Sequence, residues 1–229
     1  MRSRPKRSAR PRPRFSRTPS RLRPTIPSRQ KKTPRTPFVG LTGGIGAGKS
    51  EALKAFERLG AATLSTDQVT HELLATGEVR DLLVAELGPE VAPNGQIDRT
   101  AVASRVFGDD EKRQWLESVL WPRVGERVAS FRETSEDRPA AVVEVPLLFE
   151  SGMEAVFDKT IAVVADEAVR SGRAAARGHE LVEARTARQL SQDEKAQRAD
   201  FVVRNDGTVE ELEIKLSGVL AKLREDGHS

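Results

Sequence analysis

The sequence predicts an α/β fold whose three-layer core contains a mostly parallel sheet. Short apolar runs that suit buried strands alternate with segments of helical periodicity, and the first run, residues 38–42, leads through a glycine-rich turn into a helical pattern. Strands that alternate with helices are typical of a parallel sheet covered by helices on both faces. With 229 residues the chain is long enough for one such domain with insertions, or for two small ones.

Residues 1–37 differ in composition from the rest of the chain. They contain 14 Lys or Arg, 8 of the 13 prolines and no acidic residue, so the remaining 192 residues carry 24 basic and 34 acidic side chains, a balance of −10. We expect this arm to be disordered, and nucleic-acid binding is not indicated for the acidic remainder. Three interpretations of the arm stay open: an extension with no selected role or a start site assigned too far upstream, a weak electrostatic tether to RNA, DNA or anionic lipid, and a transit peptide.

The composition also excludes several classes of protein and site. No run approaches the roughly 18 consecutive apolar residues of a membrane helix, and no apolar segment of a secretory signal follows the basic N-terminus. The chain has no cysteine, which excludes disulfides, thiolate metal sites and cysteine nucleophiles, and its three histidines are too few and too scattered to suggest a zinc enzyme. We therefore expect a cytoplasmic protein without a membrane partner.

The turn after the first strand has the pattern of a phosphate-binding loop. Residues 43–50, Gly-Gly-Ile-Gly-Ala-Gly-Lys-Ser, match G-x-x-x-x-G-K-[ST] between a predicted strand and a helix that ends at Gly60. Glycines let backbone N–H groups approach the β- and γ-phosphates, Lys49 adds a positive charge, and the Ser50 hydroxyl suits Mg²⁺. The motif predicts a P-loop NTPase core that binds ATP and Mg²⁺ through Gly43, Gly44, Gly46, Ala47, Gly48, Lys49, Ser50 and Glu51.

A second short strand, residues 61–65, ends just before Asp67. Ligands of an open parallel sheet bind beyond the carboxyl ends of its strands, which places Asp67 on the same side as the P-loop. A carboxylate there can accept a proton from an acceptor hydroxyl or help to hold the metal ion. The alternative is that Asp67 is the N-cap of the following helix.

Residues 76–137 are more polar and mostly helical in pattern, and they lie between the second and third strands. P-loop kinases often insert the part that binds the acceptor at this point, so we expect a helical acceptor-binding insertion. The apolar centre of this section is expected to contain Phe107, Trp115, Leu116, Leu120 and Trp121, of which Trp121 directly precedes a proline.

Residues 140–150 are predicted to form a fully buried strand that meets an acid and a proline. Such a strand usually lies beside the P-loop strand and presents an acid to the water shell of Mg²⁺, so Glu144 is a candidate for the metal site. The alternative is a structural carboxylate. Residues 160–165 are predicted as another buried strand, residues 199–207 as a last strand with its turn, and residues 210–223 as a closing amphipathic helix.

Basic residues are dense beyond residue 169. Arg173 and Arg177 stand four residues apart on one helix face, where both guanidinium groups can point into a cleft and bind phosphate. The alternative is a solvated helix face whose charges pair with nearby acids. The other members of the run are Arg170, Arg185, Arg188, Lys195 and Arg198.

Taken together, these motifs resemble the dephospho-CoA kinase family over about residues 38–225. The resemblance rests on Leu41-Thr-Gly-Gly-Ile-Gly-Ala-Gly-Lys-Ser50, Asp67, Asn94-Gly-Gln-Ile-Asp-Arg99 with Val106-Phe107, Val145-Pro-Leu-Leu-Phe-Glu150, Gln189, Ala199-Asp200 and Asn205-Asp-Gly207. The chain differs from the usual family pattern at Glu51, where Thr is usual, at Ser65, where Asp is usual, at Trp121, where His is usual, and at Glu144, where Asp is usual.

The resemblance implies transfer of the γ-phosphate of ATP to the ribose 3′-hydroxyl of dephospho-CoA, which gives CoA and ADP in the last step of CoA biosynthesis. Asp67 stands at the position of the general base, with Lys49, Arg173 and Arg177 stabilising phosphate charge. The implied division is a core of residues 38–75, 138–169 and 198–226, an acceptor-binding insertion of residues 76–137, and a helical lid of residues 170–197.

Two other functions are weighed against this one. The first is a P-loop kinase whose pocket, altered at Trp121, takes another nucleoside-like hydroxyl. The second is a catalytically weak paralogue that binds ATP or CoA and uses the basic arm to regulate or tether a partner. For the assembly state, we expect a monomer or a weak homo-oligomer.

Overall fold

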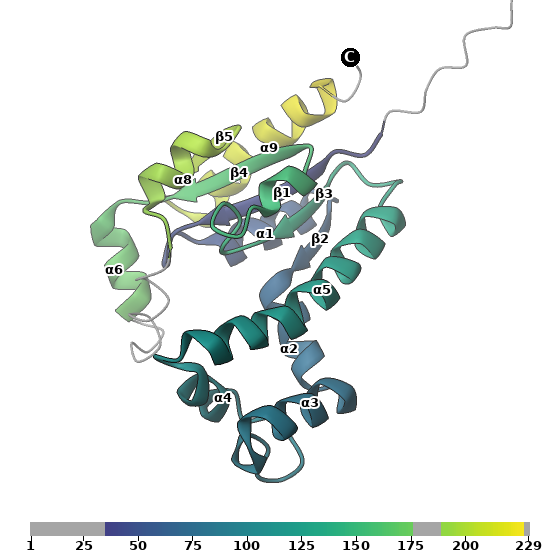
Figure 1. The fold of residues 1–229 in the computed structure, drawn as a ribbon. Coiled ribbons are helices and arrows are strands. Elements are labelled where there is room, and N and C mark those ends of the chain that lie inside the picture. Colours follow the sequence, from purple (N-terminus) through teal and green to yellow (C-terminus); the bar gives the residue numbers. More distant parts are fainter. Residues whose placement is uncertain (1–34, 176–188, 227–229) are drawn as a thin grey trace, which may run out of the picture. The chain divides into compact units, whose positions relative to one another are not determined.

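The computed structural model describes residues 35–175 and 189–226 of the chain (Figure 1). These residues fall within one compact unit, Pro34–Ser229. A second unit, Met1–Thr33, lies outside the described residues, and with it nearly all of the predicted disordered arm.

Five parallel strands form one sheet in the order β2-β3-β1-β4-β5. The strands are β1 (Phe38–Gly43), β2 (Ala62–Ser65), β3 (Ala141–Glu144), β4 (Lys159–Val164) and β5 (Phe201–Arg204). In this register Glu144 lies opposite Leu41 on one side and Ser65 on the other. The carboxyl ends of β1, β2 and β3 therefore meet at one edge of the sheet, where the P-loop also begins.

Helices cover both faces of the sheet, as the sequence predicts. On one face α1 (Lys49–Arg58) packs against α9 (Val209–Asp226), and their apolar side chains, including Phe56 and Leu216, form one core cluster with β1 and β4. On the other face α2 (Thr66–Leu74) and α5 (Asp110–Thr134) pack over β3. The described part of the chain also contains α6 (Glu167–Ala175), α8 (Gln192–Arg198) and the 3₁₀ turn η2 (Met153–Val156).

The insertion has an apolar centre of its own. It contains α3 (Gly77–Leu87), the 3₁₀ turn η1 (Pro89–Val91), α4 (Arg99–Val106) and the first half of α5, which lie together beyond the end of the sheet in Figure 1. Leu120 is buried in this centre, and Trp115 and Leu116 pack against it.

Two aromatic residues predicted for that centre are exposed instead. Phe107 is 74% exposed and Trp121 is 52% exposed. Phe107 is the extended C-cap of α4, so its side chain leaves the buried face of the helix. Trp121 follows Leu120 directly, and neighbours in a helix point about 100° apart, so the burial of Leu120 turns Trp121 toward solvent.

The third strand is shorter than predicted. β3 ends at Glu144, and a turn follows where the sequence suggests a strand through residue 150. Pro146 explains the difference, because it has no N–H to continue the ladder of a strand that is paired on both sides. The carbonyl of Pro146 accepts other hydrogen bonds, which are described with the site below.

Both ends of the described domain lie at the amino edge of the sheet. The amide of Ala141 at the start of β3 donates to the carbonyl of Pro37 at 2.9 Å. The hydrogen bonds of the sheet therefore begin one residue before Phe38, where the sequence predicts the first strand to begin. At the other end, the carboxylate of Asp226 lies 4.0 Å from Nζ of Lys159, the first residue of β4. The P-loop is at the opposite edge.

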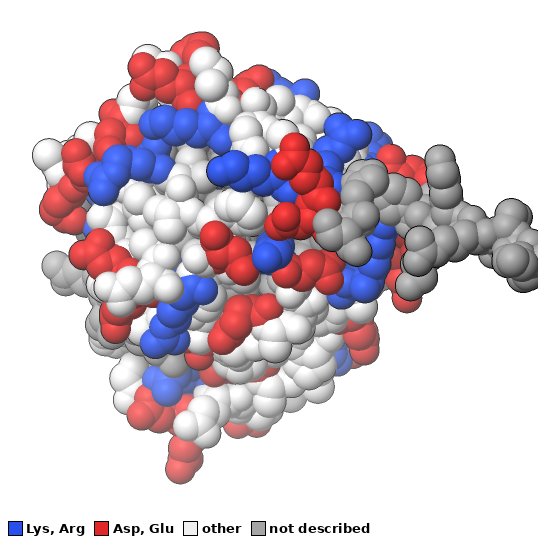
Figure 2. Space-filling view, turned by 90° about the horizontal axis from the view of Figure 1, so that it is seen from above, with Lys and Arg blue, Asp and Glu red and all other residues white. Residues whose placement is uncertain are grey.

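The surface of the domain carries mixed charge. On the face shown in Figure 2, Lys and Arg side chains are interspersed with Asp and Glu side chains. Within the described residues, no helix is long and apolar enough to span a membrane.

Candidate active site

The P-loop, residues 43–50, joins β1 to α1 and requires glycine at two positions. Gly46 and Gly48 have φ values of 76° and 96°, in the left-handed region that favours glycine. A Cβ atom at Gly46 would lie 2.6 Å from the carbonyl oxygen of Arg170, and one at Gly48 would clash with the side chain of Asn205. Gly48 is also the N-cap of α1, so the loop leads to the positive end of that helix.

Lys49 lies folded over the loop that precedes it. Its Nζ donates to the carbonyls of Gly43 at 3.0 Å and Gly44 at 3.1 Å. This places the ammonium group inside the curve of the loop, where the phosphate oxygens of a nucleotide are expected. Glu51, in the first turn of α1, pairs with Arg58 at 3.3 Å, and its contact with a nucleotide stays a prediction.

Ser50 and Glu144 come together although 94 residues separate them in the chain. The Ser50 hydroxyl donates to Glu144 Oε1 at 3.3 Å, and Glu144 is only 5% exposed. Burial raises the pKa of Glu144; the charge of Lys49 and hydrogen bonds from Ser65 and Ser50 oppose this rise, and the charge of Asp67 adds to it. A hydroxyl and a carboxylate in this arrangement are the oxygen ligands that Mg²⁺ prefers, directly or through water.

Asp67 lies in the first turn of α2, just beyond the carboxyl end of β2. The N-cap of that helix is Ser65, so the interpretation of Asp67 as the N-cap is wrong. Asp67 is exposed, and its carboxylate makes no hydrogen bond with the described part of the chain. The helix end is fixed by its neighbour Thr66, whose hydroxyl donates to the carbonyl of Glu144 at 3.0 Å.

Arg173 is beside the P-loop, on the helix α6. Its Nη1 donates to the carbonyl of Asn205 at 3.0 Å and lies 3.7 Å from the position of a Cβ on Gly48. Arg177, the second arginine of the predicted pair, lies outside the described residues. The structure therefore brings Lys49, Ser50, Asp67, Glu144 and Arg173 to one edge of the sheet, and their catalytic and metal-binding roles stay predictions.

Two residues that hold the P-loop were named in the sequence analysis without a role in the site. Arg170 donates from Nε to the carbonyl of Ile45 at 3.0 Å, and Asn205 donates from Nδ2 to the carbonyl of Ala47 at 2.9 Å. Asn205 is 5% exposed and follows β5 directly. The rule that pointed to Asp67, a polar residue just beyond the carboxyl end of a strand, applies to Asn205 as well.

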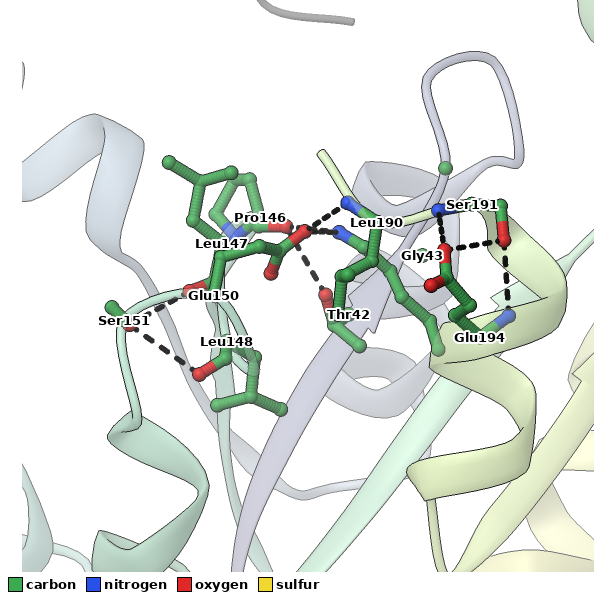
Figure 3. Close-up of polar contacts among 12 residues, drawn as sticks. Thr42, Gly43, Pro146, Leu147, Leu148, Glu150, Ser151, Leu190, Ser191 and Glu194 are labelled. Carbon is green, nitrogen blue, oxygen red and sulfur yellow. Dashed lines mark hydrogen bonds and ion pairs between the residues drawn. The ribbon is translucent and has the colours of Figure 1, made fainter. Parts of the chain in front are cut away.

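A buried ion pair connects the turn after β3 to α8 (Figure 3). Lys195, expected in a solvated or phosphate-facing run, is fully buried, and its Nζ lies 3.0 Å from Glu150 Oε1 and donates to the carbonyl of Pro146 at 2.6 Å. The same carbonyl accepts from the hydroxyl of Thr42 at 3.3 Å, and Glu150 Oε1 accepts from the amide of Leu190 at 2.8 Å. Burial lowers the pKa of Lys195, and the hydrogen bond and charge of Glu150 oppose this effect.

Replacement of Lys195 tests how much this pair stabilises the domain. We expect Lys195→Met to lower the free energy of unfolding by about 3–5 kcal/mol, because it leaves the Glu150 carboxylate buried without a cation. Urea unfolding measures the change. The double variant Lys195→Met with Glu150→Gln should recover part of the loss, and an unfolding midpoint for Lys195→Met equal to that of the parent would show that the pair contributes nothing.

Glu144→Gln should stabilise the metal-free protein at neutral pH. At low pH both the folded and the unfolded state hold a protonated Glu144, and no charge is buried. As the pH rises through the ordinary pKa and then the raised folded pKa, the unfolded state ionises first and folding loses stability. Glutamine avoids this loss, so its melting temperature should exceed that of the parent at neutral pH but not at acid pH.

Thermal unfolding in the presence of a chelator measures this difference. Glu86→Gln, which changes an exposed glutamate on α3, is the matched control and should follow the parent at both pH values. A Glu144→Gln protein that melts at or below the parent temperature at neutral pH contradicts the prediction.

A family profile and individual relatives of known name all match this chain to the same family. A sequence profile of dephospho-CoA kinase matches residues 37–211. A dephospho-CoA kinase from Protochlamydia amoebophila is 37% identical over 194 residues, which cover 81% of this chain and 96% of that protein. One from Symbiobacterium thermophilum is 39% identical over 182 residues, which cover 76% of this chain and 75% of that protein.

Two solved structures agree with this result. A crystal structure of TT1252 from Thermus thermophilus has a TM-score of 0.71 at 35% identity, covering 82% of this chain and 98% of that chain. A dephospho-CoA kinase from Campylobacter jejuni, at 22% identity, has the same fold with a TM-score of 0.55, covering 82% of this chain and 97% of that chain. By its family profile and by the extent of these identities, the chain belongs to the dephospho-CoA kinase family.

Proposed function

We propose that this protein transfers the γ-phosphate of ATP to the ribose 3′-hydroxyl of dephospho-CoA, which gives CoA and ADP in the last step of CoA biosynthesis. Membership of the dephospho-CoA kinase family supports the substrate and the reaction. The observation that carries the proposal is the placement of Asp67 and Glu144 at the carboxyl ends of neighbouring strands, beside a complete P-loop.

In this proposal the P-loop holds the ATP phosphates. The backbone N–H groups of residues 43–50 and the N-terminus of α1 bind the β- and γ-phosphates, and Lys49 exchanges the carbonyls of Gly43 and Gly44 for phosphate oxygens. Ser50 would ligate Mg²⁺, with Glu144 holding its water shell. When bound, Mg²⁺ would neutralise the negative charge of the phosphates.

Asp67 is proposed as the general base. Its carboxylate is exposed at the sheet edge, where an acceptor hydroxyl can approach, and it would accept the proton of the 3′-hydroxyl as the oxygen attacks the γ-phosphorus. Arg173 would then stabilise the charge on the transferred phosphoryl group from the side of α6, with Arg177 as its proposed partner.

The division of the chain into parts, its localisation, its assembly state and its partners also remain proposals. Residues 76–137 would bind the acceptor, and residues 170–197 would form a lid that excludes water, which competes with the acceptor for the γ-phosphate. We propose a cytoplasmic enzyme, a monomer or weak homo-oligomer, with any weak nucleic-acid contact made through the basic arm. No feature of the described site favours the alternative of a weak paralogue.

Coupled measurement of ADP release and product identity tests the function. Purified protein with Mg-ATP and dephospho-CoA should form CoA at a rate of about 1 per second or more, the range typical of kinases. ATP binding without CoA formation would reject the proposal in favour of another acceptor or a binding-only role. CoA formation would also show that Trp121, at a position where the family usually has His, is compatible with turnover.

A further inference from the structure

A cavity of about 430 Å³ lies between the P-loop and the segment that leads into α8. Residues 189–193, here called the wall segment, form one side of it, and Gly44, Ile45 and Arg170 also line it. The wall segment and the P-loop are far apart in the sequence, so packing contacts set the distance between them. The residues that make these contacts therefore determine the shape of the cavity.

The carboxylate of Glu150 fixes one end of the wall segment. Its Oε1 accepts from the amide of Leu190 at 2.8 Å and lies 3.0 Å from Nζ of Lys195 (Figure 3). Its Oε2 is buried and has no hydrogen-bond partner among the residues that the structure describes. The orientation of the carboxylate therefore depends on the two contacts of Oε1, and loss of Lys195 would leave Leu190 without a fixed acceptor.

Lys195 also connects α8 to the strand that leads into the P-loop. Its Nζ donates to the carbonyl of Pro146 at 2.6 Å, and the same carbonyl accepts from the hydroxyl of Thr42 at 3.3 Å. Thr42 directly precedes Gly43, whose carbonyl accepts from the P-loop lysine Lys49. Lys195 and Thr42 are both fully buried, so water cannot replace these contacts. One ammonium group thus contacts both the residue that fixes the wall segment and the turn that supports the P-loop strand.

A second, separate contact keeps α8 itself in place. The side-chain amide of Gln192 accepts from the backbone N–H of Ala165 at 3.2 Å and donates to the carbonyl of the same residue at 2.9 Å. Ala165 directly follows β4, which is paired with β1. Replacement of Lys195 should therefore displace the wall segment near Leu190 without releasing α8 from the sheet.

We propose that Lys195 is a positioning residue for the nucleotide site. Through Glu150 and Pro146, its ammonium group sets the distance between the wall segment and the P-loop, and it makes no contact with the nucleotide itself. The inference rests on the proposed function, because it takes the P-loop as the site of the ATP phosphates. A buried ion pair can often be replaced by apolar side chains without loss of stability, so stability alone does not account for a lysine at this position.

Steady-state kinetics of Lys195→Met test the proposal. The kcat/KM for ATP should fall by about 10²-fold, the cost of a displacement of about 1 Å at a reaction site. The KM for dephospho-CoA should stay within about twofold, because Glu150 and Pro146, which Lys195 contacts, lie outside residues 76–137.

Leu223→Ala is the matched control for a loss of stability. It shortens a buried side chain of α9 in the core cluster, so it should lower the melting temperature. Below that temperature it should leave kcat/KM for ATP unchanged. A Lys195→Met protein with the kinetic constants of Leu223→Ala would overturn the proposal.

A double variant separates positioning from stability. Lys195→Met with Glu150→Leu removes both charges and also the oxygen that accepts from Leu190, and its melting temperature should lie close to that of the parent. Its kcat/KM for ATP should stay about 10²-fold below the parent value, because the wall segment still lacks its fixed acceptor. Parent kcat/KM in this double variant would also overturn the proposal.

The outcomes for Lys195 and for the function can be distinguished. If the parent forms CoA and the Lys195 variants have the parent kcat/KM for ATP, the positioning role fails and the function stands. If the parent forms no CoA, the function fails, and calorimetric titration with Mg-ADP still tests the role. Binding of Mg-ADP about tenfold weaker in the double variant than in Leu223→Ala would then support it, and equal binding would reject it.

Discussion

Lys49→Ala should remove CoA formation, with a loss of turnover of at least about 10³-fold, the upper range for deletion of one electrostatic group that stabilises a transition state. Lys49 Nζ lies within the curve of the P-loop, between the carbonyls of Gly43 and Gly44. A methyl group in its place leaves negative charge on the phosphates without this cation. The rate of ADP release in the presence of dephospho-CoA measures the loss.

Lys54→Ala is the matched control for this variant. Lys54 is one helical turn further along α1 and is exposed, so its removal changes the same net charge without touching the loop. It should keep the parent turnover. A Lys49→Ala protein with more than about a tenth of the parent turnover would contradict the role given to the P-loop lysine. Electrostatic stabilisation of the transition state by this lysine requires a larger loss of turnover than about tenfold.

Asp67→Asn should lower turnover by about 10²-fold or more, the scale of removing a general base, and leave ATP binding unchanged. The amide keeps the size of the carboxylate but cannot accept the proton of the 3′-hydroxyl. Asp67 makes no hydrogen bond with the described residues, so the fold should not depend on its charge. Turnover and the dissociation constant for ATP, measured on the same preparation, separate chemistry from binding.

Glu72→Gln on the same helix is the control for Asp67→Asn. Glu72 pairs with Arg127 at 2.9 Å at an exposed position, so this change removes a carboxylate of α2 away from the sheet edge. Equal turnover of Asp67→Asn and the parent would show that another group, or water, takes the proton.

The site residues that the sequence predicts best are those whose positions are set by the order of the strands in the sheet. A strand, a glycine-rich turn and a helix could be placed by their periodicity, and the parallel order then brings the carboxyl ends of β1, β2 and β3 together. Asp67 follows from that rule, because it comes shortly after β2 ends. Glu144 is the last residue of β3 and was predicted from its place on a buried strand beside the P-loop strand. Their distance in the chain does not matter once the strands are paired.

Residues whose positions depend on packing between distant segments were harder to predict. Arg170 and Arg173 belong to the same helix. Their spacing does not show that Arg170 donates to Ile45 of the P-loop, or that Arg173 donates to Asn205, which itself donates to Ala47 of the P-loop. Lys195 appeared to belong to a solvated basic run, because burial of a lysine requires a partner such as Glu150, 45 residues earlier. Local sequence does not contain that information.

Two errors arise because hydrophobic periodicity does not show how an element is placed in the fold. An apolar run predicts β3 through residue 150, but pairing on both sides excludes Pro146 from the strand, and this depends on the strand order. Phe107 and Trp121 are apolar, and apolar character alone does not state which side of a helix faces the core. In α5 the buried positions are Leu120, Val124 and Val128, a stripe that excludes position 121.

The placement of both domain ends at the amino edge of the sheet has a practical consequence. Pro37 and Asp226 lie at one edge of the sheet, and the P-loop lies at the opposite edge. The six residues of β1 separate the two edges, a distance of about 20 Å. An affinity tag, fluorophore or surface linkage joined next to Pro37 or Asp226 is therefore attached on the side remote from the P-loop. Enzyme immobilised through its C-terminus should keep its reaction rate, which makes this domain suited to assays on a solid support.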